Sequence, residues 1–66
     1  MKFPLYISVS GQVNIVIDEY TYEHSFPNYT YTILAPYKIY SEELYHSLYE
    51  AIAAAYIQVY NDSLPF

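Results

Sequence analysis

The sequence predicts a two-layer α+β domain, in which a three-stranded antiparallel meander sheet packs on one C-terminal helix in the order βββα. Two features predict it. Residues 41–61 carry apolar side chains at the three- and four-residue steps of a helix, and residues 3–34 alternate with the two-residue period of strands. The 66 residues contain no repeat, linker or change in composition, so we expect a single small domain over residues 1–66.

Three strands are expected in order along the first part of the chain. Residues 3–9 alternate apolar side chains with others, and Gly11 follows where a tight turn needs a residue that tolerates positive φ. Residues 13–22 form the second strand. A proline-containing loop leads to the third strand, residues 29–34, which is rich in β-branched and aromatic residues. Residues 37–40 are expected to be an irregular crossing or a short extension.

A single helix is expected from Ser41 to Asn61. Ser41 is expected to cap its N-terminus, with Glu42 and Glu43 in the first turn, where negative charge favours the helix dipole. The side chains expected to cover the sheet share one face of the helix: Leu44, Leu48, Ala51, Ile52, Ala55 and Val59.

The rest of the helix surface is divided between a tyrosine flank and a small apolar patch. Four tyrosines are expected to pack against the sheet edge with their hydroxyl groups reaching water: Tyr45, Tyr49, Tyr56 and Tyr60. Ala53, Ala54 and Ile57 lie on the outer side. Helix propensity explains the alanines, and Ile57 leaves room for a dimer contact.

One face of the sheet is expected to meet the helix and form the core, and its side chains are Phe3, Leu5, Ile7, Val9, Val13, Ile15, Ile17, Tyr31 and Ile33. The sheet face turned away from the helix is expected to stand in water. Its side chains are mostly tyrosines, hydroxyls and a carboxylate: Tyr6, Ser8, Asn14, Val16, Asp18, Tyr20, Tyr22, Thr30 and Thr32. Tyr6, Tyr20 and Tyr22 have two explanations. They form cross-strand aromatic pairs on a solvated sheet, or they form a binding surface, since tyrosine is enriched among residues that dominate protein interfaces.

The chain is acidic, with a formal net charge of -5. The carboxylates are Asp18, Glu19, Glu23, Glu42, Glu43, Glu50 and Asp62, against only Lys2 and Lys38. This balance argues against direct binding of nucleic acid or of an anionic membrane, because both need a basic footprint. It leaves two alternatives open. The charge steers the protein to basic protein surfaces, including grooves that hold DNA or RNA, or it keeps a tyrosine-rich domain soluble.

The carboxylates are also expected to group in space. If the second and third strands are antiparallel and the helix returns along the sheet, Glu19, Glu23 and Asp62 converge at one end. Glu42 and Glu43 then mark the other end. Carboxylates spread along an edge beside tyrosines imitate the charge of a nucleic-acid strand.

No catalytic, cofactor or metal-binding motif is present. The chain has no cysteine, no glycine-rich phosphate loop and no Gly-x-Ser-x-Gly elbow, so we expect neither an enzyme nor a cofactor. His24 and His46 have no metal-ligand spacing, and no metal site is expected. No segment has the length of a signal-peptide core or of a membrane span, so we expect a soluble intracellular protein without membrane contact.

The residues expected to contact a partner are acidic and aromatic: Asp18, Glu19, Tyr20, Tyr22, Glu23, Glu42, Glu43, Glu50 and Asp62, with Tyr6 on the same open face. Together with the small size, the absence of cysteine and the short sheet with one helix, this set resembles the small phage-encoded anti-CRISPR proteins. The resemblance implies a stoichiometric, non-enzymatic inhibitor in the cytoplasm of a bacterial host. Such an inhibitor, a monomer or homodimer, occupies the DNA-binding surface of a CRISPR effector by nucleic-acid mimicry or steric block.

The alternative comes from a different class of protein. A small viral or phage structural or assembly module would self-associate through its tyrosine-rich face, and aromatic contacts rather than charge would then hold the copies together.

Overall fold

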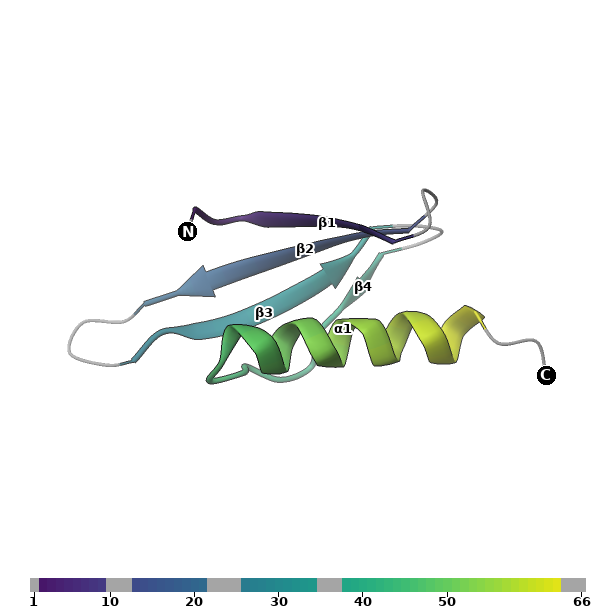
Figure 1. Ribbon diagram of the computed structural model, residues 1–66. Coiled ribbons are helices and arrows are strands. Elements are labelled where there is room, and N and C mark those ends of the chain that lie inside the picture. Colours follow the sequence, from purple (N-terminus) through teal and green to yellow (C-terminus); the bar gives the residue numbers. More distant parts are fainter. Residues whose placement is uncertain (1, 10–12, 22–25, 35–37, 64–66) are drawn as a thin grey trace.

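The computed structural model describes residues 2–9, 13–21, 26–34 and 38–63, and for residues 13, 62 and 63 it describes the backbone alone. The chain forms strands and a helix in the order β1 (Leu5–Val9), β2 (Val13–Tyr20), β3 (Asn28–Ile33), β4 (Ile39–Tyr40) and α1 (Leu48–Ser63). Figure 1 shows the strands side by side with the helix running along one side of the sheet. The predicted α+β class is confirmed.

The sheet is an antiparallel meander of four strands in the order β1-β2-β3-β4. Leu5 pairs with Ile17, and Ile17 pairs with Tyr31, so each apolar position continues across the sheet on one face. The predicted hairpin between the first two strands is confirmed by this pairing. The predicted turn at Gly11 lies outside the described residues.

The fourth strand corrects the expected three-stranded sheet. Ile39 pairs with Ile33 and Tyr40 with Thr32, in a segment expected to be an irregular crossing or short extension. The pairing satisfies backbone groups along the edge of β3, which would otherwise lack partners. Ile39 also packs against the buried core, so this short strand gains apolar contact as well as hydrogen bonds.

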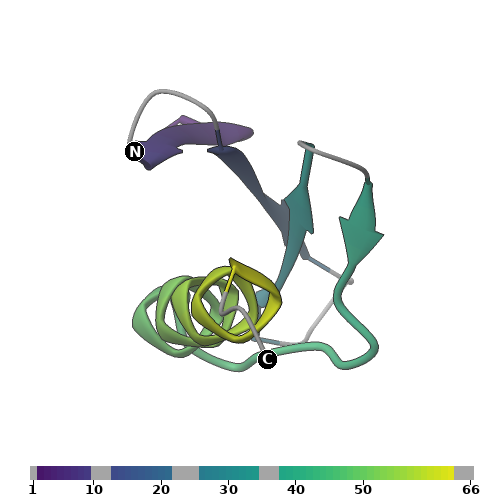
Figure 2. The ribbon, with the colours of Figure 1, turned by 90° about the vertical axis from the view of Figure 1, so that its right-hand side faces the viewer.

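The core lies between α1 and the central strands. Ile15, Ile17 and Ile33 are buried from the sheet side, and Ala51 and Ala55 from the helix side. The small side chains of Ala51 and Ala55 let the helix approach the sheet closely, and α1 contacts β3 and β2. Figure 2 shows the sheet curving over the helix, with β1 at the far edge. The expected core face of the sheet and most of the helix stripe are therefore confirmed.

The helix begins at Leu48 and not at Ser41, because Ser47 is its cap. The Tyr49 amide donates to Ser47 Oγ at 3.1 Å, and the Ala51 amide donates to the Ser47 carbonyl at 3.1 Å. Glu50 stands in the first turn, which completes the spacing of a capping box, Ser-x-x-Glu. The predicted cap at Ser41 is wrong, and so is the expected placement of Glu42 and Glu43 in the first turn.

The predicted packing of the helix tyrosines is also wrong, except for Tyr45. Tyr49 is 80% exposed and Tyr60 64% exposed, and Tyr56 is exposed as well. Each helical residue turns about 100°, which places Tyr49 on nearly the opposite side of α1 from Ala51. Tyr45 precedes the helix and packs against the core, while Leu44, expected in the core stripe, is exposed.

Candidate functional site

A bulge in the chain between β4 and α1 positions the candidate site. The Ser41 amide donates to the Tyr31 carbonyl at 3.0 Å, and the Tyr31 amide donates to Ser41 Oγ at 3.3 Å. Further along, Tyr45 pairs with Tyr29 through backbone hydrogen bonds of 2.7 and 2.8 Å. Three residues, 42–44, therefore stand opposite the single residue Thr30 between these two paired positions. They are forced out of the ladder and are exposed.

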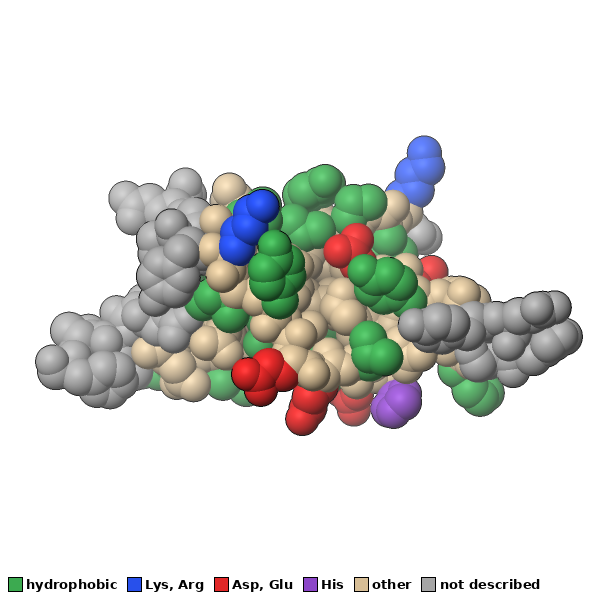
Figure 3. All heavy atoms as spheres, turned by 180° about the vertical axis from the view of Figure 1, so that it is seen from behind, with side chains coloured by type: hydrophobic (Ala, Val, Ile, Leu, Met, Phe, Trp, Pro, Cys, Tyr) green, Lys and Arg blue, Asp and Glu red, His purple; other side chains and the backbone are tan. Residues whose placement is uncertain are grey.

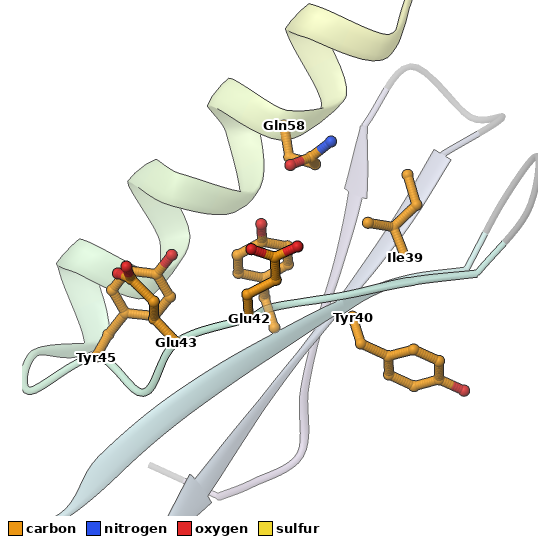
Figure 4. Close-up of a pocket in the computed structure, with 7 residues that line it drawn as sticks. Ile39, Tyr40, Glu42, Glu43, Tyr45 and Gln58 are labelled. Atoms are coloured by element: carbon orange, nitrogen blue, oxygen red, sulfur yellow. The ribbon is translucent and has the colours of Figure 1, made fainter.

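A pocket of about 380 Å³ opens between this bulge and the helix. Its lining combines acidic, aromatic and amide groups from β3, β4, the bulge and α1: Tyr31, Ile39, Tyr40, Glu42, Glu43, Tyr45 and Gln58. In Figure 4 the side chain of Gln58 extends from the helix over the hollow, and Glu42 and Glu43 lie on the opposite wall, whereas the ring of Tyr40 points away. We call this feature the acidic pocket.

The acidic pocket has an aromatic floor and a negative potential. The rings of Tyr31 and Tyr45 are stacked with their centroids 6.1 Å apart and an interplanar angle of 27°. Burial raises the pKa of Tyr45 above its usual value, and the charges of Glu43 and then Glu42 raise this pKa further. The two carboxylates beside this ring make a further negative charge unfavourable here and a positive one favourable.

A second tyrosine and carboxylate lie at the end of β2, on the helix side of the sheet. Glu19 pairs with Tyr29, and the Tyr29 ring lies 5.7 Å from the Phe3 ring at an angle of 51°. The pKa of Tyr29 is raised first by burial and then by a side-chain hydrogen bond to Glu19 and by the charge of Glu19. This carboxylate is engaged within the protein.

The open face of the sheet carries part of the predicted partner surface. A row runs across all four strands, from Tyr6 through Val16 and Thr32 to Tyr40, with Tyr6 69% and Tyr40 63% exposed. The open-face positions expected from the sequence are confirmed where they are described, and Tyr40 is added by the fourth strand. Figure 3 shows this side of the molecule, with some acidic side chains along its lower margin, others higher up beside hydrophobic side chains, and the basic side chains toward the upper side.

The predicted partner-binding residues are thus distributed over several surfaces. Tyr6, Asp18 and Tyr20 share the open face, since each lies at an even position in the β1–β2 register. Glu19 points to the opposite face. Glu42 and Glu43 lie at the bulge, and Glu50 is exposed in the first turn of α1. Tyr22 and Glu23, as well as the side chain of Asp62, lie outside the described residues.

The expected convergence of Glu19 with Asp62 is wrong. The helix starts beside the end of the sheet where Glu19 pairs with Tyr29, and it runs to the other end, where residue 62 lies in its last turn (Figure 1). Because Tyr45 pairs with Tyr29, the bulge with Glu42 and Glu43 lies toward the Glu19 end and does not mark the opposite one.

Sequence reasoning named Glu42 and Glu43 but missed the other pocket residues. One signal was present for the bulge. The spacing of Ser47 and Glu50 is that of a capping box, and it separates the glutamates from the helix. Gln58 and Tyr31 have no such signal, because their proximity depends on how the helix lies on the sheet.

The described residues contain neither a metal-binding group nor a membrane-spanning helix. No group of three or more His, Asp or Glu side chains in that part of the chain is placed to hold a metal ion. Among the same residues, no helix is long and apolar enough to cross a membrane. Comparison with protein-family models, with curated proteins and with solved structures gave no match.

Proposed function

We propose that this protein is a non-enzymatic inhibitor that binds the basic, nucleic-acid-binding surface of a partner protein through the acidic pocket and the adjoining open face. One observation carries the proposal. The bulge presents two consecutive exposed glutamates, Glu42 and Glu43, over a hollow with a tyrosine floor.

The proposal rests on how strongly a carboxylate attracts a cation, because this attraction is weaker on an open surface than in a hollow. An ion pair on an open surface contributes about 0–1 kcal/mol, because water screens it. In a hollow, a bound cation displaces water, so the same charges act through a lower dielectric. The net charge of -5 adds long-range attraction to a basic partner and raises the rate of encounter.

The open face extends the proposed contact surface. Tyr40 is exposed on that face and lies two positions before Glu42 in the chain, so tyrosine contacts and carboxylate contacts adjoin. Tyrosine buries a large area at small entropic cost. Aromatic contacts next to the charges allow the protein to block a groove sterically, as well as by resembling the charge of nucleic acid.

The partner class follows from the anti-CRISPR resemblance. A CRISPR effector in a bacterial cytoplasm has a basic channel that holds nucleic acid, and occupation of that channel would prevent DNA binding. The inhibitor would act stoichiometrically, as a monomer or homodimer, without a cofactor.

The direct test measures target-DNA binding by purified CRISPR effector complexes with increasing amounts of this protein. We expect DNA binding to fall as the protein reaches equimolar amounts, and the inhibition to weaken as salt increases, because charge contributes to it. The double variant Glu42→Gln/Glu43→Gln should inhibit less. Undiminished DNA binding at large excess of the wild-type protein across the effector types would contradict the proposal.

The second candidate is a self-associating structural or assembly module, and the exposed aromatic residues favour it. Tyr6 and Tyr40 stand on the open face, while Tyr49 and Tyr60 form a separate exposed group on α1. Sedimentation analysis distinguishes the candidates. A discrete dimer that persists or strengthens at high salt, together with no effect on an effector, would support this module.

A further inference from the structure

We propose that the acidic pocket binds a single guanidinium group, that of an arginine on the partner's basic surface. This inference rests on the proposed function and deepens it, because it names the group that the pocket would recognise. It is carried by three features that coincide in one place: a hollow, a stacked aromatic pair, and two carboxylates on the facing wall.

The chemistry of the lining selects a cation. Ionised carboxylates only accept hydrogen bonds, and both Glu42 and Glu43 belong to the pocket wall. The side chain of Gln58 closes the helix side of the pocket with a polar, uncharged group. Tyrosine rings attract a cation placed over their faces. Since the described lining includes no lysine or arginine, an anion would find no opposite charge here.

The shape of the site favours a guanidinium over an ammonium group. A guanidinium is planar, stacks on aromatic rings and donates several hydrogen bonds in a fixed fork, whereas an ammonium is a compact and strongly hydrated point charge. The half-buried ring of Tyr45, held by its stacking on the buried ring of Tyr31, offers an aromatic face at the pocket. The neighbouring carboxylates offer acceptors for two or more charge-assisted hydrogen bonds.

The size of the pocket also points to an organic group. Its volume of about 380 Å³ lies at the lower end of the range for small-molecule sites, roughly 300–1,000 Å³. This space accommodates the head and part of the stem of one long side chain. A bare metal ion would leave most of it unfilled.

The test uses N-acetyl-L-arginine methylamide as the probe and follows the protein by NMR. We expect saturable shifts of the Gln58 side-chain amide and the Tyr45 ring, with no shift at Tyr49, which lies on the far side of α1. The corresponding lysine derivative should bind several-fold more weakly, because it lacks the planar fork.

Matched variants separate the pocket from net charge. Glu42→Gln/Glu43→Gln should lower the affinity for the arginine probe about tenfold, because it removes the charge-assisted acceptors. Glu19→Gln/Glu50→Gln removes the same charge from residues outside the pocket and should leave the affinity within about twofold. Gln58→Glu should raise the affinity by more than Ser8→Glu, which adds the same charge on the exposed face of β1. Non-saturable shifts, or equal losses in the two double variants, would overturn the assignment.

The assignment of the pocket to a guanidinium group and the proposed function can be contradicted independently of each other. If the arginine probe binds as expected but no effector is inhibited, the pocket assignment stands and the proposed function fails. If an effector is inhibited and Glu42→Gln/Glu43→Gln inhibits equally well, the proposed function stands and the pocket assignment fails.

Discussion

Tyr29 and Tyr45 face each other across the edge of the sheet, joined by two backbone hydrogen bonds of 2.7 and 2.8 Å, and they differ in how nearby carboxylates act on them. Both have raised pKa values, with burial as the largest cause. At Tyr29, the next cause is a hydrogen bond to Glu19. At Tyr45, the remaining causes are the charges of Glu43 and Glu42.

The difference shows how one kind of residue pair serves two purposes. Glu19 satisfies part of its hydrogen-bonding capacity on a neighbouring strand, and the ring of Phe3 contacts its tyrosine partner. Glu42 and Glu43 are displaced from the ladder by the bulge and line a hollow. We infer that the first carboxylate contributes to the fold and that the other two are available for recognition.

The largest effect on stability is expected at Tyr31, because its buried ring supports the ring of Tyr45. Tyr31 is 6% exposed and stacks on Tyr45, so Tyr31→Ala should lower the free energy of unfolding by about 3–5 kcal/mol, as for other large aromatic truncations in a core. Urea denaturation measures it. Tyr49→Ala, at an exposed position, is the control and should change stability by about 0.5 kcal/mol or less. Equal effects of the two substitutions would contradict the described core.

A smaller effect is expected at Ser47, which fixes where the bulge segment ends and the helix begins. Ser47→Ala removes the acceptor of the Tyr49 amide and should cost about 1 kcal/mol of unfolding free energy. Ser8→Ala, on the exposed face of β1, serves as the control. A loss no larger than that of the control would show that the helix does not depend on this cap.

The smallest expected effect is a change in the pKa values of Tyr29 and Tyr45. Glu42→Gln/Glu43→Gln should lower the pKa of Tyr45 and leave that of Tyr29 unchanged, because only Tyr45 feels these charges. Glu19→Gln should do the reverse. NMR titration of labelled tyrosine rings from about pH 9 to 12 brackets the usual pKa of about 10. Parallel shifts of both rings in either variant would contradict the assignment of separate partners.

The same pKa directions fix the sign of a pH effect on stability. A raised pKa means that the folded state holds the phenol proton more tightly than the unfolded state does. The stability from Tyr29 and Tyr45 is therefore complete below the unfolded value near pH 10 and is lost as the pH rises through the higher folded values. Chemical denaturation at increasing alkaline pH should show this loss, and a flat profile across that range would contradict it.

The strands were the part of the fold that the sequence predicted best. A period of two assigns each residue to one face, so Ile15, Ile17 and Ile33 were placed in the core and Tyr6 and Asp18 on the open face. Alternation cannot predict whether a segment of two residues such as Ile39–Tyr40 joins the sheet. Its pairing depends on the edge that β3 offers to it.

The start of the helix was mispredicted because two start signals compete. Ser41 precedes two glutamates, and Ser47 precedes Glu50 at the capping-box spacing. Backbone pairing of Ser41 with Tyr31 decides between them, and that contact joins residues distant in sequence. The candidate site depends on the same contact, so the sequence indicated the two glutamates but not their hollow.

A synthetic arginine-rich peptide tests whether recognition lies at the bulge, and calorimetry gives its affinity for three proteins of known net charge. The wild-type protein, Glu42→Gln/Glu43→Gln and Glu19→Gln/Glu50→Gln are compared at the same ionic strength. If recognition lies at the bulge, the first double variant should bind about tenfold more weakly, while the second stays within about threefold of wild type. Equal weakening by both double variants would show that net charge alone attracts the peptide, and would contradict a recognition role for Glu42 and Glu43.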